Sequence, residues 1–239
     1  MMSGHSTVQI WTATLGTPNS SGLLMTAFSQ NSTDEYFASG IAVNPTGTDL
    51  YFIGTDFVIS TQARTDFGEH CVVGGACNTL NNPVAGTSSG TEVGSTLYVG
   101  GYVFYNISGT LTRYQPSTNQ STTLTGVNGN IFTDGTYVYY NVSGSIVRVT
   151  PSTMATQATV QVPSGYIPLT SDGTYVYSSA NNPTNPTATT VTATPFGPIA
   201  TQVLSPVQPY PAALVAAGGF LVWAVTNDAD SYVDALRFP

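Results

Sequence analysis

The chain contains no lysine and few charges of any kind. Its 239 residues hold four basic residues, all of them arginine, against 12 Asp and Glu, which gives a net charge of -8 with 7% charged residues. DNA, RNA and anionic membranes are bound through clustered cations. The composition therefore excludes a basic face for nucleic acid and a polybasic membrane anchor.

The scarcity of charge also bears on the setting in which the protein works. Acid unfolds proteins by protonating paired carboxylates and by leaving a large positive charge that repels itself. This chain has little of either, so one hypothesis places it in an acidic or otherwise harsh extracellular setting. The other is a hydroxyl-rich exported surface with no such selection.

Long hydrophobic runs are also lacking. The longest, residues 212–225, is interrupted by two glycines and falls short of the ~20 residues that span a bilayer. The first residues have neither the positive region nor the apolar region of a signal peptide. We therefore expect no membrane insertion, and either a signal that has been removed or a release route such as lysis.

The chain has two cysteines, Cys71 and Cys77, separated by a stretch that includes a Gly-Gly pair. A chain that folds back there can close a local disulfide in an oxidising compartment. Two free buried thiols are the alternative. Glu69 and His70 stand beside them, but the spacing matches no standard zinc pattern, so we predict no metal site there.

What the sequence does have is an internal repeat. Tyr102–Val127 aligns with Tyr137–Val162 at an offset of 35 residues, with eleven of 26 positions identical. A third copy begins at Asp172, and looser copies occupy Ile41–Phe52 and Ala213–Trp223. Repeats of this length indicate a structural unit that buries its faces by stacking on its neighbours.

Each unit predicts four short strands, rich in Val, Ile, Tyr and Thr and bounded by Gly, Pro, Asn and Ser. In the best copy the expected strands are Asn130–Thr133, Tyr137–Val142, Ser145–Thr150 and Ala158–Val162. A four-stranded repeat is typical of a β-propeller blade. The predicted fold is therefore all-β, a single β-propeller domain over residues 1–239, with a β-sandwich as the alternative.

The anchors of the second strands give the number of blades. They are Tyr51, Val103, Val138, Val176 and Val222. These predict five blades, with six as the next count. The ring is expected to close by one blade shared between the two ends of the chain. Its strands would be Val8–Leu15, Leu23–Phe28, Ala213–Ala217, Phe220–Val225 and Tyr232–Phe238.

One segment resembles a known repeat. Residues 40–52, GIAVNPTGTDLYF, resemble the GIAVSPDGTRLYV segment of YVTN and NHL-like propellers, and residues 137–153 resemble the segment that follows it. Thr46 stands where that family has Asp, and the YVTN tetrapeptide is absent. The resemblance implies propeller architecture and says almost nothing about activity.

Catalytic patterns are scarce. The chain has no Gly-x-Ser-x-Gly nucleophile elbow, phosphate loop or dinucleotide fingerprint. His5 lies near the amino terminus and His70 beside the cysteine loop, and neither has a recognisable acid partner. A Ser-His-Asp triad is therefore not expected, and the sequence predicts no cofactor.

Carboxylates in a central pocket would be the mark of a glycosidase. Asp134 and Asp172 precede glycine at equivalent turn positions, which favours a structural role. Asp34 and Glu35, just before a first strand, and Glu92, near another, are the remaining candidates. A carbohydrate-active enzyme is thus an alternative, and the more favoured interpretation is no enzyme.

Other polar segments offer weaker sites. Asp228, Asp230 and Asp234 have a loose resemblance to calcium ligands, although a polar hairpin loop explains them as well. The Pro- and Thr-rich segment 181–190 predicts a protruding contact loop that presents three amides. These are Asn181, Asn182 and Asn185.

Five Asn-x-Ser/Thr sequons are candidates for N-glycosylation. They are Asn19, Asn31, Asn106, Asn119 and Asn141. Asn106 and Asn141 share a repeat position beside a Ser-Gly hairpin turn, and good turn chemistry alone accounts for that pattern.

These observations predict a non-enzymatic propeller, extracellular or on a virion surface. It would act as a structural or binding module for adhesion or for the recognition of glycans or proteins. A homo-oligomer that builds a filament or shell is a third hypothesis.

Overall fold

A computed structural model describes most of the chain, and the regular secondary structure in it is β-strand. The described residues are 7–12, 22–29, 34–58, 60–61, 63–80, 93–180, 189–198, 201–208, 211–217, 219–226 and 231–237. Within these ranges no helix is long and apolar enough to cross a membrane. The chain divides into two compact units, Met1–Thr125 and Gly126–Pro239, and each is described by itself.

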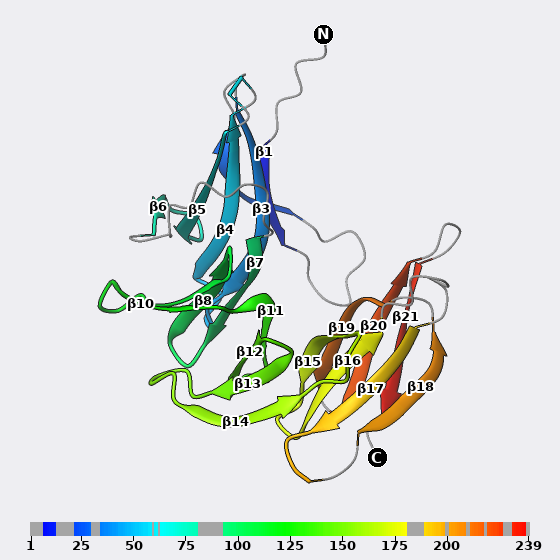
Figure 1. The fold of residues 1–239 in the computed structure, drawn as a ribbon. Helices are drawn as coiled ribbons and strands as arrows, with labels where there is room; N and C mark the ends of the chain where they lie inside the picture. Colours follow the sequence, from blue (N-terminus) through cyan, green and yellow to red (C-terminus); the bar gives the residue numbers. More distant parts are fainter. Residues whose placement is uncertain are drawn as a thin grey trace. The chain divides into compact units, whose positions relative to one another are not determined.

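The first unit contains a hairpin and two four-stranded antiparallel sheets (Figure 1). The hairpin is β1 (Thr7–Thr12) and β2 (Gly22–Ser29). The first sheet is β3 (Asp34–Val43), β4 (Asp49–Val58), β5 (Ala63–Val72) and β6 (Cys77–Thr79). The second is β7 (Val93–Val99), β8 (Tyr102–Ile107), β9 (Thr110–Gln115) and β10 (Gln120–Thr125).

The second unit contains two more four-stranded sheets and a three-stranded one. The first is β11 (Asn128–Thr133), β12 (Val138–Val142), β13 (Ser145–Val149) and β14 (Thr156–Gln161). The second is β15 (Tyr166–Ser171), β16 (Tyr175–Ala180), β17 (Thr189–Pro195) and β18 (Gln202–Gln208). The last is β19 (Pro211–Ala217), β20 (Phe220–Thr226) and β21 (Ser231–Arg237).

The predicted four-strand repeat is confirmed, because the strands of each four-stranded sheet pair in chain order. All five predicted anchors lie on second strands, in β4, β8, β12, β16 and β20. The Ser-Gly turns between second and third strands are equivalent in two sheets. Ser108 and Gly109 have φ values of 49° and 80°, and Ser143 and Gly144 have 50° and 84°. Two successive positive φ angles make the tight hairpin whose twist matches that of the strands.

The first strand of the first sheet is longer than the sequence predicts. β3 begins at Asp34, so Asp34 and Glu35 lie within the strand, whereas the sequence predicts that they come just before it. They pair with Val58 and Phe57 of β4. The aromatic residues that follow them favour strand structure, and the long partner β4 continues the ladder beyond the bulge at Ala38/Gly40.

The hydrophobic core lies between successive sheets of each unit. In the first unit Tyr51 and Ile53 of β4 pack with Val103 and Tyr105 of β8. In the second unit Tyr139 of β12 packs in one cluster with residues that include Val176 of β16, and Tyr177 of β16 packs with Leu214 and Leu221. The sheets therefore cover one another face to face, as a stack of blades requires. Closure of the ring by the terminal strands, and the single domain, stay predictions.

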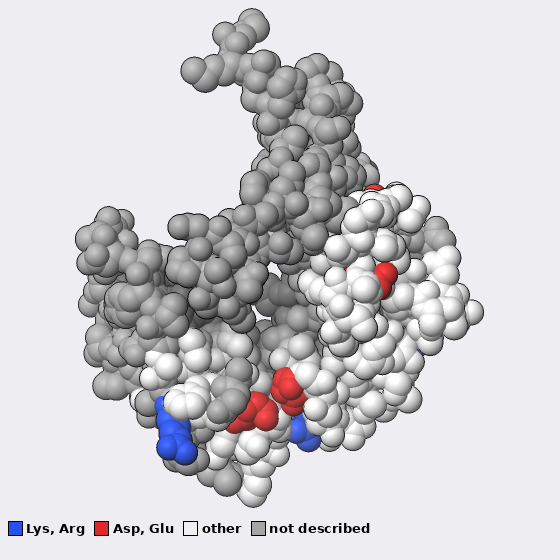
Figure 2. All heavy atoms as spheres, turned by 180° about the vertical axis from the view of Figure 1, so that it is seen from behind, with Lys and Arg blue, Asp and Glu red and all other residues white. Residues whose placement is uncertain are grey.

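The described surface is largely neutral. Figure 2 shows a few acidic and basic spots among uncharged side chains on the face in view, some of them next to one another. Several large apolar side chains are also exposed. They are Ile41, Val43, Val72, Leu124, Ile167, Val215 and Phe220.

Candidate functional site

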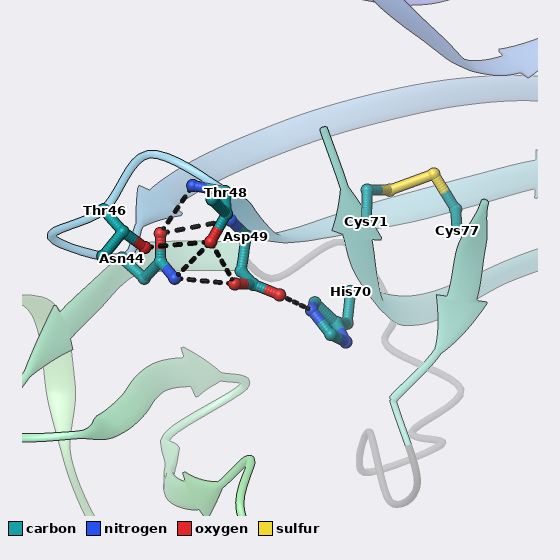
Figure 3. A network of polar contacts seen from close by, with 7 residues as sticks. All are labelled: Asn44, Thr46, Thr48, Asp49, His70, Cys71 and Cys77. Atoms are coloured by element: carbon teal, nitrogen blue, oxygen red, sulfur yellow. Dashed lines mark hydrogen bonds and ion pairs between the residues drawn. A yellow bond between two sulfur atoms is a disulfide. The ribbon is translucent and has the colours of Figure 1, made fainter. Parts of the chain in front are cut away.

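The turn between β3 and β4 carries a dense cluster of polar side chains, which we call the corner cluster. It comprises Asn44, Thr46, Thr48, Asp49 and His70 (Figure 3). Asn44 Oδ1 accepts hydrogen bonds from the backbone N–H groups of Thr48 at 2.9 Å and Asp49 at 3.1 Å. Asn44 Nδ2 donates to Asp49 Oδ2 at 2.6 Å. The asparagine thus takes the place of backbone partners and holds the turn in one conformation.

The strand register brings His70 into this cluster. Tyr51 of β4 pairs with His70 of β5, so Asp49, two residues before Tyr51, is a diagonal neighbour on the same face. His70 Nε2 lies 2.7 Å from Asp49 Oδ1. The imidazole also stacks on the Tyr51 ring with the centroids 4.7 Å apart. His70 therefore has an acid partner that the sequence did not reveal.

These contacts stabilise the ionised form of Asp49. Hydrogen bonds from the Thr48 hydroxyl and from His70 lower the pKa of the Asp49 carboxyl below its usual value, against the opposing effect of burial. The Thr48 hydroxyl donates to Asp49 Oδ2 at 2.7 Å, and Thr46 Oγ1 lies 2.9 Å from Thr48 Oγ1. A chain of hydroxyls therefore ends on the carboxylate.

The corner cluster lacks the geometry of a nucleophilic triad. In a triad the acid binds one imidazole nitrogen and the nucleophile binds the other. Here both threonine hydroxyls lie on the side of Asp49 that faces away from His70 (Figure 3). The cluster therefore braces a turn, and nothing in it positions a hydroxyl for attack.

A disulfide lies beside the corner cluster and confirms the predicted pairing of Cys71 with Cys77. The two cysteines face each other in the β5–β6 register. The turn that they close is tied to the neighbouring turn, because Val73 N donates to Thr48 O at 2.9 Å. With both sulfurs in this bond, and with Glu69 and His70 on opposite faces of β5, the four residues do not converge on a metal. A search of the described residues finds no group of three or more His, Cys, Asp or Glu that could hold one.

Two buried carboxylates lie further along β5. Asp66 is 2% exposed and its Oδ1 accepts the Thr55 hydroxyl at 2.8 Å. Glu69 is 7% exposed and its Oε1 accepts the Thr79 hydroxyl at 3.1 Å. Burial raises the pKa of Glu69, and the Thr79 hydrogen bond offsets this in part. The two side chains alternate across the strand, so they do not form a pair of the kind glycosidases use.

The turn between β11 and β12 shows what Asp134 does. Its Oδ1 accepts the backbone N–H groups of Thr136 at 2.8 Å and Tyr137 at 2.7 Å. Its Oδ2 accepts the hydroxyl of Tyr139 at 2.7 Å. The carboxylate closes the turn and anchors the buried phenol of the next strand, so the predicted structural role is confirmed.

The turn between β15 and β16 repeats this arrangement. Asp172 Oδ1 accepts the N–H groups of Thr174 at 2.8 Å and Tyr175 at 2.7 Å, and its Oδ2 accepts the hydroxyl of Tyr177 at 2.7 Å. Burial, followed by the hydrogen bond to Asp172, raises the pKa of Tyr177 above its ordinary value. We call each such set a carboxylate–phenol turn.

An arginine links the two sheets that carry these turns. Arg148 Nη1 donates to the carbonyl of Gly173 at 2.8 Å. Its guanidinium lies over the rings of Tyr137 and Phe196, 4.9 and 4.8 Å from their centroids. Asp134 is close by, because a Cβ on Gly173 would lie 2.9 Å from its Oδ2. The second unit therefore uses its charged groups to join adjacent sheets.

The predicted glycosylation sites differ in exposure. Asn106 is 4% exposed. Asn141 is half-buried, and its Oδ1 accepts Gly144 N–H at 3.0 Å. Asn119 is exposed, and its Oδ1 accepts the Tyr114 hydroxyl at 3.1 Å. The shared repeat position of Asn106 and Asn141 thus lies near the end of the second strand of each sheet, just before the hairpin turn, and use of any of these sequons stays a prediction.

The remaining predicted site residues lie outside the described part of the chain or have only their backbone described. Asp234 lies in β21 opposite Trp223, so it belongs to a strand rather than to a loop. The residues that lie outside are His5, Asn19, Asn31, Glu92, Asn181, Asn182, Asn185, Asp228 and Asp230.

No family model matches the chain, and a search of curated proteins gives no match either. Solved structures do match it. A chain of the "Crystal Structure of Mitotic Checkpoint Complex" is 11% identical with a TM-score of 0.51, covering 98% of this chain and 82% of that one. Two crystal structures of Pyrococcus horikoshii acylaminoacyl peptidase are 6% identical with TM-scores of 0.54 and 0.53. Both alignments cover 84% of this chain and 44% of the peptidase chain.

At these identities the likeness concerns the fold alone. With the succession of four-stranded antiparallel sheets, it defines the protein as an all-β propeller, and the sheets are its blades. The likeness to YVTN and NHL-like repeats remains a resemblance.

Proposed function

We propose that this propeller is a non-enzymatic structural and binding module that recognises glycans or proteins outside the cell, on a cell or virion surface. The carrying observation is the use of its carboxylates. Twelve acidic residues occur in the chain, and those with described side chains all bind groups of the scaffold. They are Asp49, Asp66, Glu69, Asp134 and Asp172.

Two further features support the proposal. The disulfide between Cys71 and Cys77 is of a kind that persists in oxidising compartments and is rare in the cytosol. The exposed side chains include many hydroxyls and amides and a few apolar groups, which suit neutral ligands such as glycans or uncharged protein surfaces. Acid tolerance belongs to the same proposal, because few charges change on acidification.

A carbohydrate-active enzyme is the second candidate, and one observation favours it. Asp34 and Glu35 lie within β3, the first strand of its blade, and first strands are where pocket carboxylates of a propeller glycosidase would sit. Consecutive positions of a strand belong to opposite faces of the sheet. A carboxyl pair for sugar hydrolysis would therefore need a second acid from elsewhere.

One experiment separates the two candidates. The purified chain is applied to a glycan array, and sugar release from every bound glycan is then measured, for the parent and for a D34N/E35Q variant. We expect binding without sugar release, and equal binding by the variant. Sugar release by the parent that the variant lacks would establish the enzyme instead. If neither the arrayed glycans nor surface proteins of a cell or virion bind the purified chain, the recognition role is overturned.

A further inference from the structure

The outer strand β10 is an open sheet edge. It pairs with β9 along its whole length, from Gln120 opposite Gln115 to Thr125 opposite Thr110, without a register shift. It is the last strand of its sheet, and within the described ranges no strand pairs with its other side. Alternate residues of an edge strand direct backbone N–H and C=O groups away from the sheet. β10 therefore presents an uninterrupted row of hydrogen-bonding groups.

This edge lacks the features that usually protect one. Native proteins guard edges with lysine, proline, inward charges, bulges or very short strands. The sequence of β10, QSTTLT, has no charge, proline or glycine, and five of its six residues are exposed, with Ser121 half-buried. Leu124 at 37% exposure adds an apolar contact.

The other outer strands are better protected. β6 has three residues, β18 contains a proline, and β21 contains Asp234 and Arg237. β14 is uncharged like β10, but the register shifts at Arg148/Val149 beside its first residue. The regular, unguarded edge is thus β10.

We propose that β10 pairs antiparallel with β10 of a second copy of this chain, so that one blade continues into the next molecule. A two-fold axis normal to the sheet places Thr122 opposite Thr122, or Thr123 opposite Thr123. Both registers bring threonine and serine hydroxyls face to face, which is a favourable cross-strand pairing. β10 itself carries no charge, and the nearest cation, Arg113 of β9, donates to the Thr122 hydroxyl at 3.2 Å. In a pair of copies the two arginines belong to strands three spacings apart, about 14 Å, so their repulsion is weak.

The proposal concerns assembly, and it holds whether or not the propeller binds glycans. T123K tests it, because both registers bring the two new lysines opposite or diagonal to each other on one face. S117K is the matched control, since it adds the same charge in the exposed turn just before the strand. The molar mass of each full-length protein is measured by light scattering over a concentration series, together with a circular dichroism spectrum.

We expect the parent and S117K to dimerise, and T123K to associate about tenfold more weakly or worse. T123E should be monomeric alone and should form a heterodimer when mixed with T123K, because opposite charges then face each other. This arm also shows that the variants are folded. A parent that stays monomeric, a T123K as dimeric as S117K, or a mixture that stays monomeric would each overturn the proposal.

Discussion

The carboxylate–phenol turns allow a double-mutant test of what holds the blades. The Tyr139 side chain is fully buried, and its hydroxyl donates to Asp134 Oδ2 at 2.7 Å. A hydrogen bond to a charged group stabilises by about 1.5–3 kcal/mol, so Y139F should reduce the free energy of unfolding by about that amount. D134V should cost more, because it removes two turn hydrogen bonds and leaves a buried hydroxyl without its acceptor.

The double variant D134V/Y139F should cost less than the sum of the two. At the offset of 35 residues, the blade of β7–β10 has Val99 and Phe104 at these positions. The Asp–Tyr pair and the Val–Phe pair are therefore alternative solutions within one chain. The expected coupling free energy between Asp134 and Tyr139 is about 2 kcal/mol. The cost of the lost turn hydrogen bonds appears both in D134V and in the double variant, so it cancels in the cycle.

Equilibrium urea unfolding of the full chain, followed by tyrosine fluorescence, measures the cycle. The matched control is the second copy of the turn, where D172V and Y177F should show the same coupling. Additivity within about 0.5 kcal/mol at both turns would refute the reasoning, because the phenol and the carboxylate would then contribute independently.

Four further predictions concern other contacts. Replacing Cys71 and Cys77 with serine should lower the free energy of unfolding by about 2 kcal/mol, the entropy of so short a loop, as read from urea midpoints with and without reductant. E69Q should raise the free energy of unfolding at pH 7. It should also remove the gain in stability that the parent shows as pH falls through the raised pKa of Glu69. An unchanged pH profile of stability would contradict this. The contribution of ionised Asp49 to the free energy of unfolding should persist as pH falls to the ordinary pKa of 3.8. It should be lost only below that pH, as pH falls through the lowered pKa of Asp49 in the folded protein. R148K should lose about 1–2 kcal/mol in the same assay despite its retained charge, because lysine lacks the planar group that stacks on two rings.

The sequence repeat and the residues of its turns are enough to predict most of the fold. Asp134 followed by Gly135, with φ +88° in the structure, marks a turn from sequence alone, and the alternation of Val and Tyr after it marks a strand. The phenol partner of Asp134 needed a further step. The covariation of the two residues between repeats was the available signal, since Phe104 replaces the tyrosine where the aspartate is missing.

The corner cluster could not be read in the same way. Asp49 and His70 lie 21 residues apart, and they meet only because β4 and β5 pair with Tyr51 opposite His70. A slip of one residue in that register would place Asp49 and His70 on opposite faces. The sequence did not specify the hairpin closely enough to choose between these registers, so the acid partner of His70 became visible only in three dimensions.

The absence of lysine connects the acid response to the open edge. A chain without lysine gains little positive charge below pH 4, which limits the self-repulsion that drives acid unfolding. The same absence removes the residue that most often keeps an edge strand from pairing with another molecule. A selection that removed cations from this surface would therefore favour both persistence in acid and association through β10. T123K should separate the two effects, because it should prevent association through β10 while acid stability is kept.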